Sequence, residues 1–258
     1  MKLCVIGGAG ARSAFLTKSL VKSTRDIRVD HIVLLDNGQQ KLKTYGEISR
    51  ELSRRLDPDL TFEVTSDARA ALTGVDYIIT TIRAGGDAGR LFDEQTCLAH
   101  GVLGQETTGA GGFAMAIRSV PTLVYYCTLA REVANPGHLI FNFTNPSGII
   151  TQALRSKGFD NVYGICDAPS GFIKQLEEIL EIPYGTLDIE CYGLNHLSWF
   201  RNAKVNGRDV QRELLDNPRT YEHSEMRLFT REMARISGDC MLNEYLYFYY
   251  RRVKSLSM

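Results

Sequence analysis

The first 36 residues follow the order strand, glycine turn, helix, strand and acid. Lys2–Ile6 is a short apolar run typical of a buried strand, and three of the next four residues are glycine. A helix is expected at about residues 12–22, and residues 31–36 form the second expected strand. In this order, the glycine turn lets a dinucleotide pyrophosphate approach the helix N-terminus. The pattern predicts one half of a dinucleotide-binding sheet.

Strands and helices continue to alternate as far as residue 165. Further strands are expected at residues 61–65, 75–82, 138–143 and 161–165, and helices at 39–56 and 113–134. This alternation predicts an α/β fold with a Rossmann-like, doubly wound parallel sheet. Residues 84–112 carry eight glycines and are expected to form a long irregular segment with a functional role.

The pattern changes after residue 168. A helix is expected at residues 170–180, followed by β-rich runs at 186–194 and 198–205 and then by helices. We predict two domains: residues 1–168 bind NAD, and residues 169–258 form an incomplete α+β domain for substrate and metal.

Composition excludes some classes of function. The 258 residues contain 30 Lys and Arg against 30 Asp and Glu, so the basic excess typical of nucleic-acid binders is missing. No run reaches the ~18 unbroken apolar residues expected of a membrane helix, so we expect no membrane partner. Six scattered cysteines without a paired motif are typical of reduced thiols, which predicts a cytoplasmic protein.

The glycine turn departs from the full dinucleotide fingerprint, because Ser13 stands where a third glycine is usual. Glycines are common in ordinary turns, so the prediction of a dinucleotide site depends on the strand, helix and acid around the turn. Asp36 is expected to bind the ribose hydroxyls of NAD. The pyrophosphate is expected at the turn and the start of the helix, on Gly8, Gly10, Ala11 and Arg12.

Two separated residues are candidates for binding a metal ion. Cys166 follows an expected strand, at the edge where parallel sheets bind ligands, and His196 comes thirty positions later. A thiolate and an imidazole suit a divalent transition metal. On spacing alone, a small core cysteine and a locally bonded histidine are the simpler interpretation.

Tyr245 lies in the aromatic run of residues 245–250. Such a run is most simply a core helix with buried rings. A tyrosine also acts as a base where a cation stabilises its phenolate. Both interpretations remain open from the residues alone.

Several short motifs occur together in the order found in one family. They are Val5-Ile-Gly-Gly-Ala-Gly10, Ile82-Arg83, Gly104-Gln-Glu-Thr-Thr-Gly-Ala-Gly-Gly112, Asn142-Phe-Thr-Asn-Pro146, Cys166-Asp-Ala-Pro-Ser-Gly171 and Gly193-Leu-Asn-His196. The sequence resembles glycoside hydrolase family 4, the glycosidases that depend on NAD and Mn²⁺. The resemblance covers nearly the whole chain, and the motifs around Cys166 and His196 make it specific.

The resemblance implies an exception to hydrolysis by two carboxylates. NAD oxidises the C3 hydroxyl of the sugar, which acidifies the C2 proton, and a tyrosine removes that proton while the metal stabilises the charge. The leaving group departs, water adds, and NADH returns the hydride. The implied substrates are 6-phospho-β-glucosides, either phosphorylated disaccharides or aryl glucosides, and a homo-oligomer is expected.

The resemblance also implies a role for particular residues. Cys166 and His196 correspond to the metal ligands, Asp167 to the general acid, and Tyr245 to the base. Substrate contacts are expected from Arg90, Asn145 and Glu106. Arginine suits a phosphate because it offers several donors and keeps its charge.

Family members are considerably longer than this sequence, which ends thirteen residues after Tyr245. Two alternatives to an active 6-phospho-β-glucosidase therefore stay open. One is a 6-phospho-α-glucosidase of the same family. The other is a truncated, inactive homologue that only binds NAD.

Overall fold

A computed structural model describes residues 1–250, which form two compact units. The first unit comprises Met1–Asp93 and Gly112–Ile165, and the second comprises Glu94–Gly111 and the chain from Cys166 onward. The predicted boundary after residue 168 lies close to the start of the second unit at Cys166. Residues 94–111, predicted to belong to the first domain, are grouped with the second unit because their contacts are made there.

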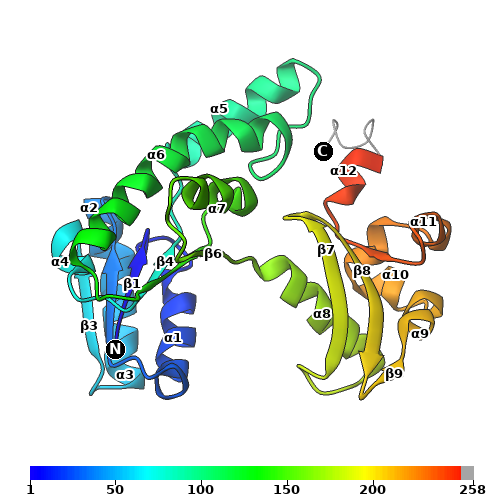
Figure 1. Cartoon of the computed structure of the whole chain (residues 1–258), viewed down its shortest axis with the longest axis horizontal. Coiled ribbons are helices and arrows are strands. Elements are labelled where there is room, and N and C mark those ends of the chain that lie inside the picture. Colours follow the sequence, from blue (N-terminus) through cyan, green and yellow to red (C-terminus); the bar gives the residue numbers. More distant parts are fainter. Residues whose placement is uncertain (251–258) are drawn as a thin grey trace. The chain divides into compact units, whose positions relative to one another are not determined.

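The first unit contains a six-stranded parallel sheet in the order β3-β2-β1-β4-β5-β6 (Figure 1). This is the predicted Rossmann-like arrangement, in which the strand order reverses beside β1. The strands are β1 (Lys2–Ile6), β2 (His31–Leu35), β3 (Thr61–Thr65), β4 (Tyr77–Thr80), β5 (Leu139–Asn142) and β6 (Val162–Gly164).

Alternate residues of β1 enter two different apolar clusters of the first unit. Leu3 and Val5 pack in a cluster with Val21 of α1, whereas Cys4 and Ile6 pack with residues of α4, α6 and α7. Side chains alternate across a strand, so both faces of the sheet are buried. The helices are α1 (Ser13–Ile27), α2 (Gln39–Lys41), the π-helix η1 (Leu42–Gly46), α3 (Glu47–Leu56), α4 (Ala68–Leu72), α5 (Gly86–Ala99), α6 (Gly109–Val133) and α7 (Ser147–Ser156).

Helix α5 corrects the expectation that residues 84–112 are irregular. The glycines of this segment gather at Gly85, Gly86 and Gly89 and again after residue 100, and the residues between them lack glycine and proline. That stretch supports a helix, because leucine, arginine, glutamate, glutamine and alanine all favour one. The irregular part is confined to about residues 100–108.

Helix α6 has 25 residues and contains Pro121. Within residues 1–250 it alone is long and apolar enough to cross a membrane, judged by length and composition. Core helices pass the same test, and 39% of its apolar window is buried. Arg118, in the middle of α6, forms an ion pair with the buried Asp93 of α5. The middle of the helix therefore packs against α5 inside the first unit.

The second unit is built on a small antiparallel sheet in the order β10-β8-β7, with β9 paired to β8 (Figure 1). Its apolar cluster contains Phe172, Phe200 and Met226. This is the predicted α+β region. Its strands are β7 (Leu187–Leu194), β8 (Leu197–Val205), β9 (Arg208–Asp209) and β10 (Met241–Leu242), and its helices are α8 (Asp167–Leu180), α9 (Gln211–Asp216), α10 (Thr220–His223), the 3₁₀ helix η2 (Glu225–Leu228), α11 (Arg231–Ile236) and α12 (Leu246–Tyr250).

Replacing Phe172 with alanine should destabilise the second unit by about 3–5 kcal/mol. Phe172 is fully buried, and its ring meets that of Phe200 edge-on at 4.9 Å. Urea unfolding followed by the fluorescence of Trp199, the single tryptophan, measures this unit. The control is Ile236→Ala, at a side chain 86% exposed, which should change the unfolding free energy by less than about 0.5 kcal/mol. Equal losses in the two variants would contradict the assignment of Phe172 to the core.

Candidate functional site

The glycine turn after β1 adopts a form that side chains would obstruct. Gly7 has φ +82°, and a Cβ there would lie 2.8 Å from the backbone of Thr81. At Gly8 a Cβ would lie 2.9 Å from the carbonyl oxygen of Val5, whereas Gly10 faces open space. The turn is therefore packed tightly beneath and open above, as close approach by a phosphate requires.

Ser13 occupies the place of the third glycine without disturbing this turn. Its hydroxyl donates to the carbonyl oxygen of Gly10 over 2.5 Å, and its side chain is buried. Ser13 is also the first residue of α1. The departure from the full fingerprint is thus accommodated by one local hydrogen bond.

An open cleft of about 620 Å³ lies over the turn. Its walls include four of the five predicted cofactor-binding residues, and the fifth, Gly8, is buried beneath them. The loop after β4 and side chains of α6 complete the walls of the cleft. The sequence did not predict that these two segments contact the cofactor. The lining residues are Gly7, Gly10, Ala11, Arg12, Asp36, Asn37, Lys41, Thr81–Asp87, Thr122 and Tyr126.

Asp36 follows directly after β2 and is held by backbone donors. Its Oδ2 accepts from the N–H of Ala9 at 3.3 Å, and its Oδ1 accepts from the N–H of Gly38 at 2.9 Å. A carboxylate offers about four acceptor positions, so positions remain for a diol. The carboxylate is thus oriented beside the glycine turn, as a ribose contact requires.

Two of the predicted substrate-binding residues lie in the first unit. Arg90 is half-buried on α5, and Asn145 is half-buried just before the cis peptide bond to Pro146. The loop that carries Asn145 begins in a buried polar network: Thr80 donates to Asn142 at 2.8 Å, and Thr144 accepts from the N–H of Ile82 at 3.1 Å. The ends of β4 and β5 are therefore tied together where Asn145 emerges.

The second unit brings the predicted metal ligands together. Cys166 stands immediately before α8, and His196 lies in the two-residue turn between β7 and β8. The Sγ of Cys166 and the Nε2 of His196 are 3.4 Å apart. Two atoms that each lie ~2.0–2.3 Å from one ion are roughly 3–4 Å apart, so both side chains fit a shared ion.

His196 is placed by a turn with an uncommon backbone. Its φ is +58°, in the left-handed region that histidine enters more often than most residues. Gly193, with φ +121°, allows the hairpin to close, because a Cβ there would overlap the carbonyl oxygen of Leu197. Such backbones often occur at functional sites.

The surroundings of His196 favour its neutral form. Burial lowers the pKa of His196, and the negative charges of Asp167 and Glu106 oppose that change. The neutral imidazole is the form that binds metal ions. Its Nδ1 is buried without a hydrogen-bond partner within residues 1–250. No group of three or more potential metal ligands occurs in that same part of the chain.

Tyr245 stacks on His196. The two ring centroids are 4.3 Å apart, and the ring planes differ by 23°. The ring of Tyr245 therefore contacts a predicted metal ligand. Together, these contacts gather Cys166, Asp167, Glu106, His196 and Tyr245 in the second unit.

A buried carboxylate that the sequence did not single out holds the turn before Tyr245. The Oε2 of Glu225 accepts from Asn243 Nδ2 at 3.1 Å and from the N–H of Glu244 at 2.9 Å. Asn243 Oδ1 in turn accepts from the N–H of Tyr245 at 3.2 Å. Burial raises the pKa of Glu225 to about 7.

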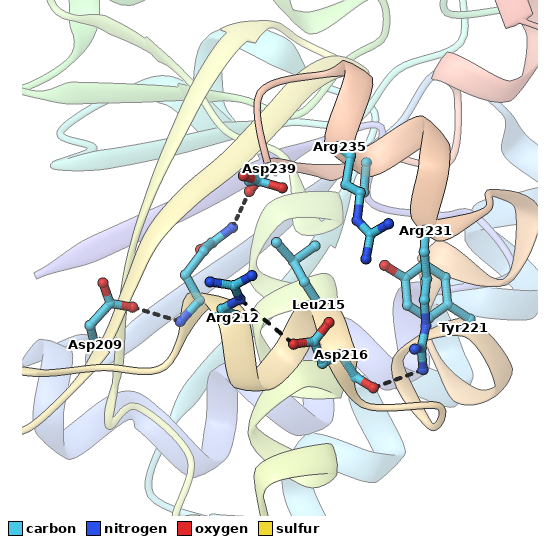
Figure 2. A pocket seen from close by; sticks show the side chains of 10 residues that line it. Asp209, Arg212, Leu215, Asp216, Tyr221, Arg231, Arg235 and Asp239 are labelled. Atoms are coloured by element: carbon cyan, nitrogen blue, oxygen red, sulfur yellow. Dashed lines mark hydrogen bonds and ion pairs between the residues drawn. The ribbon is translucent and has the colours of Figure 1, made fainter.

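A second cavity of about 390 Å³ lies in the second unit among β9, α9, α10 and α11 (Figure 2). Arg231 donates to the carbonyl oxygen of Asp216 at 2.7 Å and covers the ring of Tyr221. Arg212 pairs with the carboxylate of Asp216 at 3.9 Å. The cavity lining has three arginines and three aspartates, so its formal charges balance. The contact of Arg231 with Asp216 joins α11 to α9, and the pair of Arg212 with Asp216 lies within α9.

Comparison with known proteins identifies related sequences. Residues 2–182 match the family described as Family 4 glycosyl hydrolase, and residues 191–257 match its C-terminal domain. The 6-phospho-beta-glucosidase BglT of Thermotoga maritima is 35% identical over 219 residues, which are 84% of this chain and 51% of that protein. The chain spans about half the length of the curated relatives it matches.

Solved structures agree with the sequence matches. A 6-phospho-beta glucosidase from Thermotoga maritima, with NAD and glucose-6-phosphate, has a TM-score of 0.89 at 31% identity and covers 100% of this chain and 60% of that one. A 6-phospho-alpha-glucosidase from gut microorganisms, in complex with NAD and Mn²⁺, has a TM-score of 0.89 at 27% identity and covers 99% of this chain and 62% of that one.

The raised pKa of Glu225 predicts a pH-dependent stability. Between the unfolded value of ~4.5 and about 7 the folded protein binds more protons, so stability falls as pH rises through this window. The loss is complete above pH ~7 and amounts to about 3 kcal/mol at most. Glu225→Gln, which stays neutral, should remove this fall in unfolding free energy between pH 5 and 8.

The matched control is Glu222→Gln, at an exposed carboxylate beside His223. It should keep the wild-type pH dependence when unfolding in urea is followed by Trp199 fluorescence. An unchanged pH dependence in Glu225→Gln would show that the buried carboxylate is not protonated in this range.

Proposed function

Because this chain belongs to the family 4 glycosyl hydrolases, we propose that it takes part in the hydrolysis of 6-phospho-β-glucosides with NAD and a divalent metal ion, Mn²⁺ being the ion we expect. The observation that carries the proposal is the cluster in the second unit, where Cys166 approaches His196 and Tyr245 stacks on it. A thiol and an imidazole beside a phenol suit metal-assisted proton abstraction.

NAD is proposed to bind in the cleft of the first unit. The turn around Gly8 and Gly10 and the start of α1 at Ala11 and Arg12 would receive the pyrophosphate. Asp36 would accept hydrogen bonds from the adenosine ribose, since backbone donors already orient its carboxylate. When bound, NAD supplies a hydride acceptor for the sugar.

The metal ion is proposed to bind Cys166 and His196. Their spacing and the favoured neutral imidazole both suit this role. When bound, the ion stabilises negative charge that develops on the sugar oxygens. Tyr245 would take the proton from C2, and Asp167 would give a proton to the departing oxygen. Arg90, Asn145 and Glu106 would bind the sugar, with Arg90 suited to the phosphate.

The β anomer is preferred because BglT, at 35% identity, is a 6-phospho-beta-glucosidase. A 6-phospho-α-glucosidase is the second candidate, favoured by the similar structure with NAD and Mn²⁺. All six cysteines are free thiols, which supports the proposed cytoplasmic location. The homo-oligomer stays a prediction.

Asp36→Ala should weaken NAD binding by about 10- to 100-fold, because charged hydrogen bonds to the ribose are lost. The affinity for NADP should fall less, since the same change removes repulsion of the 2′-phosphate. Calorimetric titration with each cofactor measures both affinities. The exposed Asp26→Ala serves as control and should leave both unchanged. Equal losses for the two cofactors would mean that Asp36 does not contact the ribose.

Release of a chromophore from 6-phospho-β- and 6-phospho-α-glucosides tests the activity. With NAD, Mn²⁺ and a thiol reductant present, the β substrate should be cleaved, and omission of NAD or metal should stop the reaction. Cys166→Ser should abolish metal-dependent turnover with NAD affinity near normal, since a ligating thiolate is lost.

Cys191→Ser, at an exposed thiol of the same unit, is the matched control and should stay active. Cleavage of the α substrate alone would favour the second candidate. A wild-type chain that binds NAD but cleaves neither substrate would support the inactive homologue.

A further inference from the structure

The loop that precedes α6 has little freedom to fold in another way. A Cβ at Gly104 would lie 2.5 Å from the carbonyl oxygen of Glu94, and a Cβ at Gly111 would lie 2.6 Å from the carbonyl oxygen of Gln105. Gly109 has φ +66°, which favours glycine. Glycine at these positions therefore allows the backbone of this loop, which carries Gln105, to pack closely.

The side-chain amide of Gln105 has a defined orientation. Its Oε1 accepts hydrogen bonds from the N–H of Thr107 and from the N–H of Thr108, the second at 2.9 Å. Two backbone donors require the oxygen on this side, so the amide group must point its NH₂ the opposite way. That NH₂ donates to the hydroxyl oxygen of Tyr245 at 3.3 Å.

The ring and the backbone of Tyr245 make further contacts. The ring stacks on His196 and meets Phe248 edge-on at 5.5 Å, and Asn243 bonds its N–H. Ring stacking alone does not fix the position of the phenol oxygen within the plane of the ring. The bond from Gln105, a residue 140 positions away in the sequence, restricts that movement at the oxygen.

We propose that Gln105 is a positioning residue that holds the phenol oxygen of Tyr245 where it receives the proton from the sugar. The inference rests on the proposed role of Tyr245 as the base. The C2–H bond breaks, its proton goes to the oxygen of Tyr245 in the phenolate form that a bound cation favours, and its electron pair delocalises onto the adjacent C3 carbonyl oxygen of the oxidised sugar. The Gln105 NH₂ occupies one lone pair of the oxygen, and another would accept the proton.

The substitution Gln105→Glu separates the positioning of the Tyr245 oxygen from the role of Gln105 in holding its own loop. Glutamate has the same shape and its oxygens still accept from Thr107 and Thr108, but an ionised carboxylate donates nothing to Tyr245 and repels its phenolate, so both effects act at the base oxygen. The rate of deuterium uptake at C2 of glucose 6-phosphate, measured in D₂O with NAD and Mn²⁺, should fall about 10- to 100-fold. NAD affinity, KM and the melting temperature should stay near wild type, and the isotope effect of C2 deuteration should rise.

A second readout needs neither cofactor nor turnover. In protein labelled with ¹³C at tyrosine Cζ, the resonance missing from Tyr245→Phe belongs to Tyr245. This resonance should move in Gln105→Glu because the hydrogen bond to its oxygen is lost. It should stay in place in Gln152→Glu, which alters an exposed glutamine of α7 by the same atoms.

The outcomes distinguish the positioning role from the base itself. Full deuterium uptake by Tyr245→Phe, or none by the wild type, would refute the base and the positioning role together. If Tyr245→Phe is inactive while Gln105→Glu exchanges at the wild-type rate, only the positioning role is refuted. Loss in Gln105→Leu but not in Gln105→Glu would assign Gln105 to loop structure alone and would also overturn the proposal.

Discussion

Strand β1 is hydrogen-bonded on both edges, to β2 and to β4, and the first unit depends on this pairing. Because all six strands run parallel, the chain leaves each of them at the same edge of the sheet. The glycine turn, Asp36 and the loop beginning at Thr81 are therefore neighbours because the strands that they follow are paired. The close approach of Gly7 to Thr81 is a direct consequence, since both residues follow paired strand ends.

The second unit achieves the same kind of convergence by other means. The hairpin turn gives His196 a left-handed backbone, and Cys166 immediately precedes α8. Tyr245 is contacted by Gln105 from the loop before α6, and the turn before it is held by the buried Glu225. No single sheet edge gathers these residues. Each is placed by its own local structure, and both Cys166 and Tyr245 contact the imidazole of His196.

Regular elements could largely be predicted from the sequence. The alternating residues 61–65 are strand β3, and the run containing Phe172 is a helix, because periodicity follows directly from burial. Helix α5 was missed because glycines at its first turn concealed a stretch, residues 90–99, in which six residues favour a helix. The cluster around His196 followed from the family motifs alone, since the spacing of Cys166 and His196 favoured the simpler interpretation. Gln105 and Glu225 could not be found this way, because their importance lies in contacts with residues far along the chain.

The choice of an amide at position 105 has an electrostatic reason. His196 already feels the charges of Asp167 and Glu106, and both act against its neutral form. A carboxylate at position 105 would accept the same two backbone hydrogen bonds but would add a third negative charge near the imidazole and would disfavour the phenolate that a tyrosine base requires. Glutamine supplies the acceptor that shapes the loop and the donor that meets Tyr245, and it adds no charge. Glu225, in contrast, is a carboxylate that accepts hydrogen bonds from the N–H of Glu244 and the side chain of Asn243, not from the phenol of Tyr245. The two supports of Tyr245 thus differ in charge, and only the neutral one, Gln105, contacts the hydroxyl oxygen that we propose as the base.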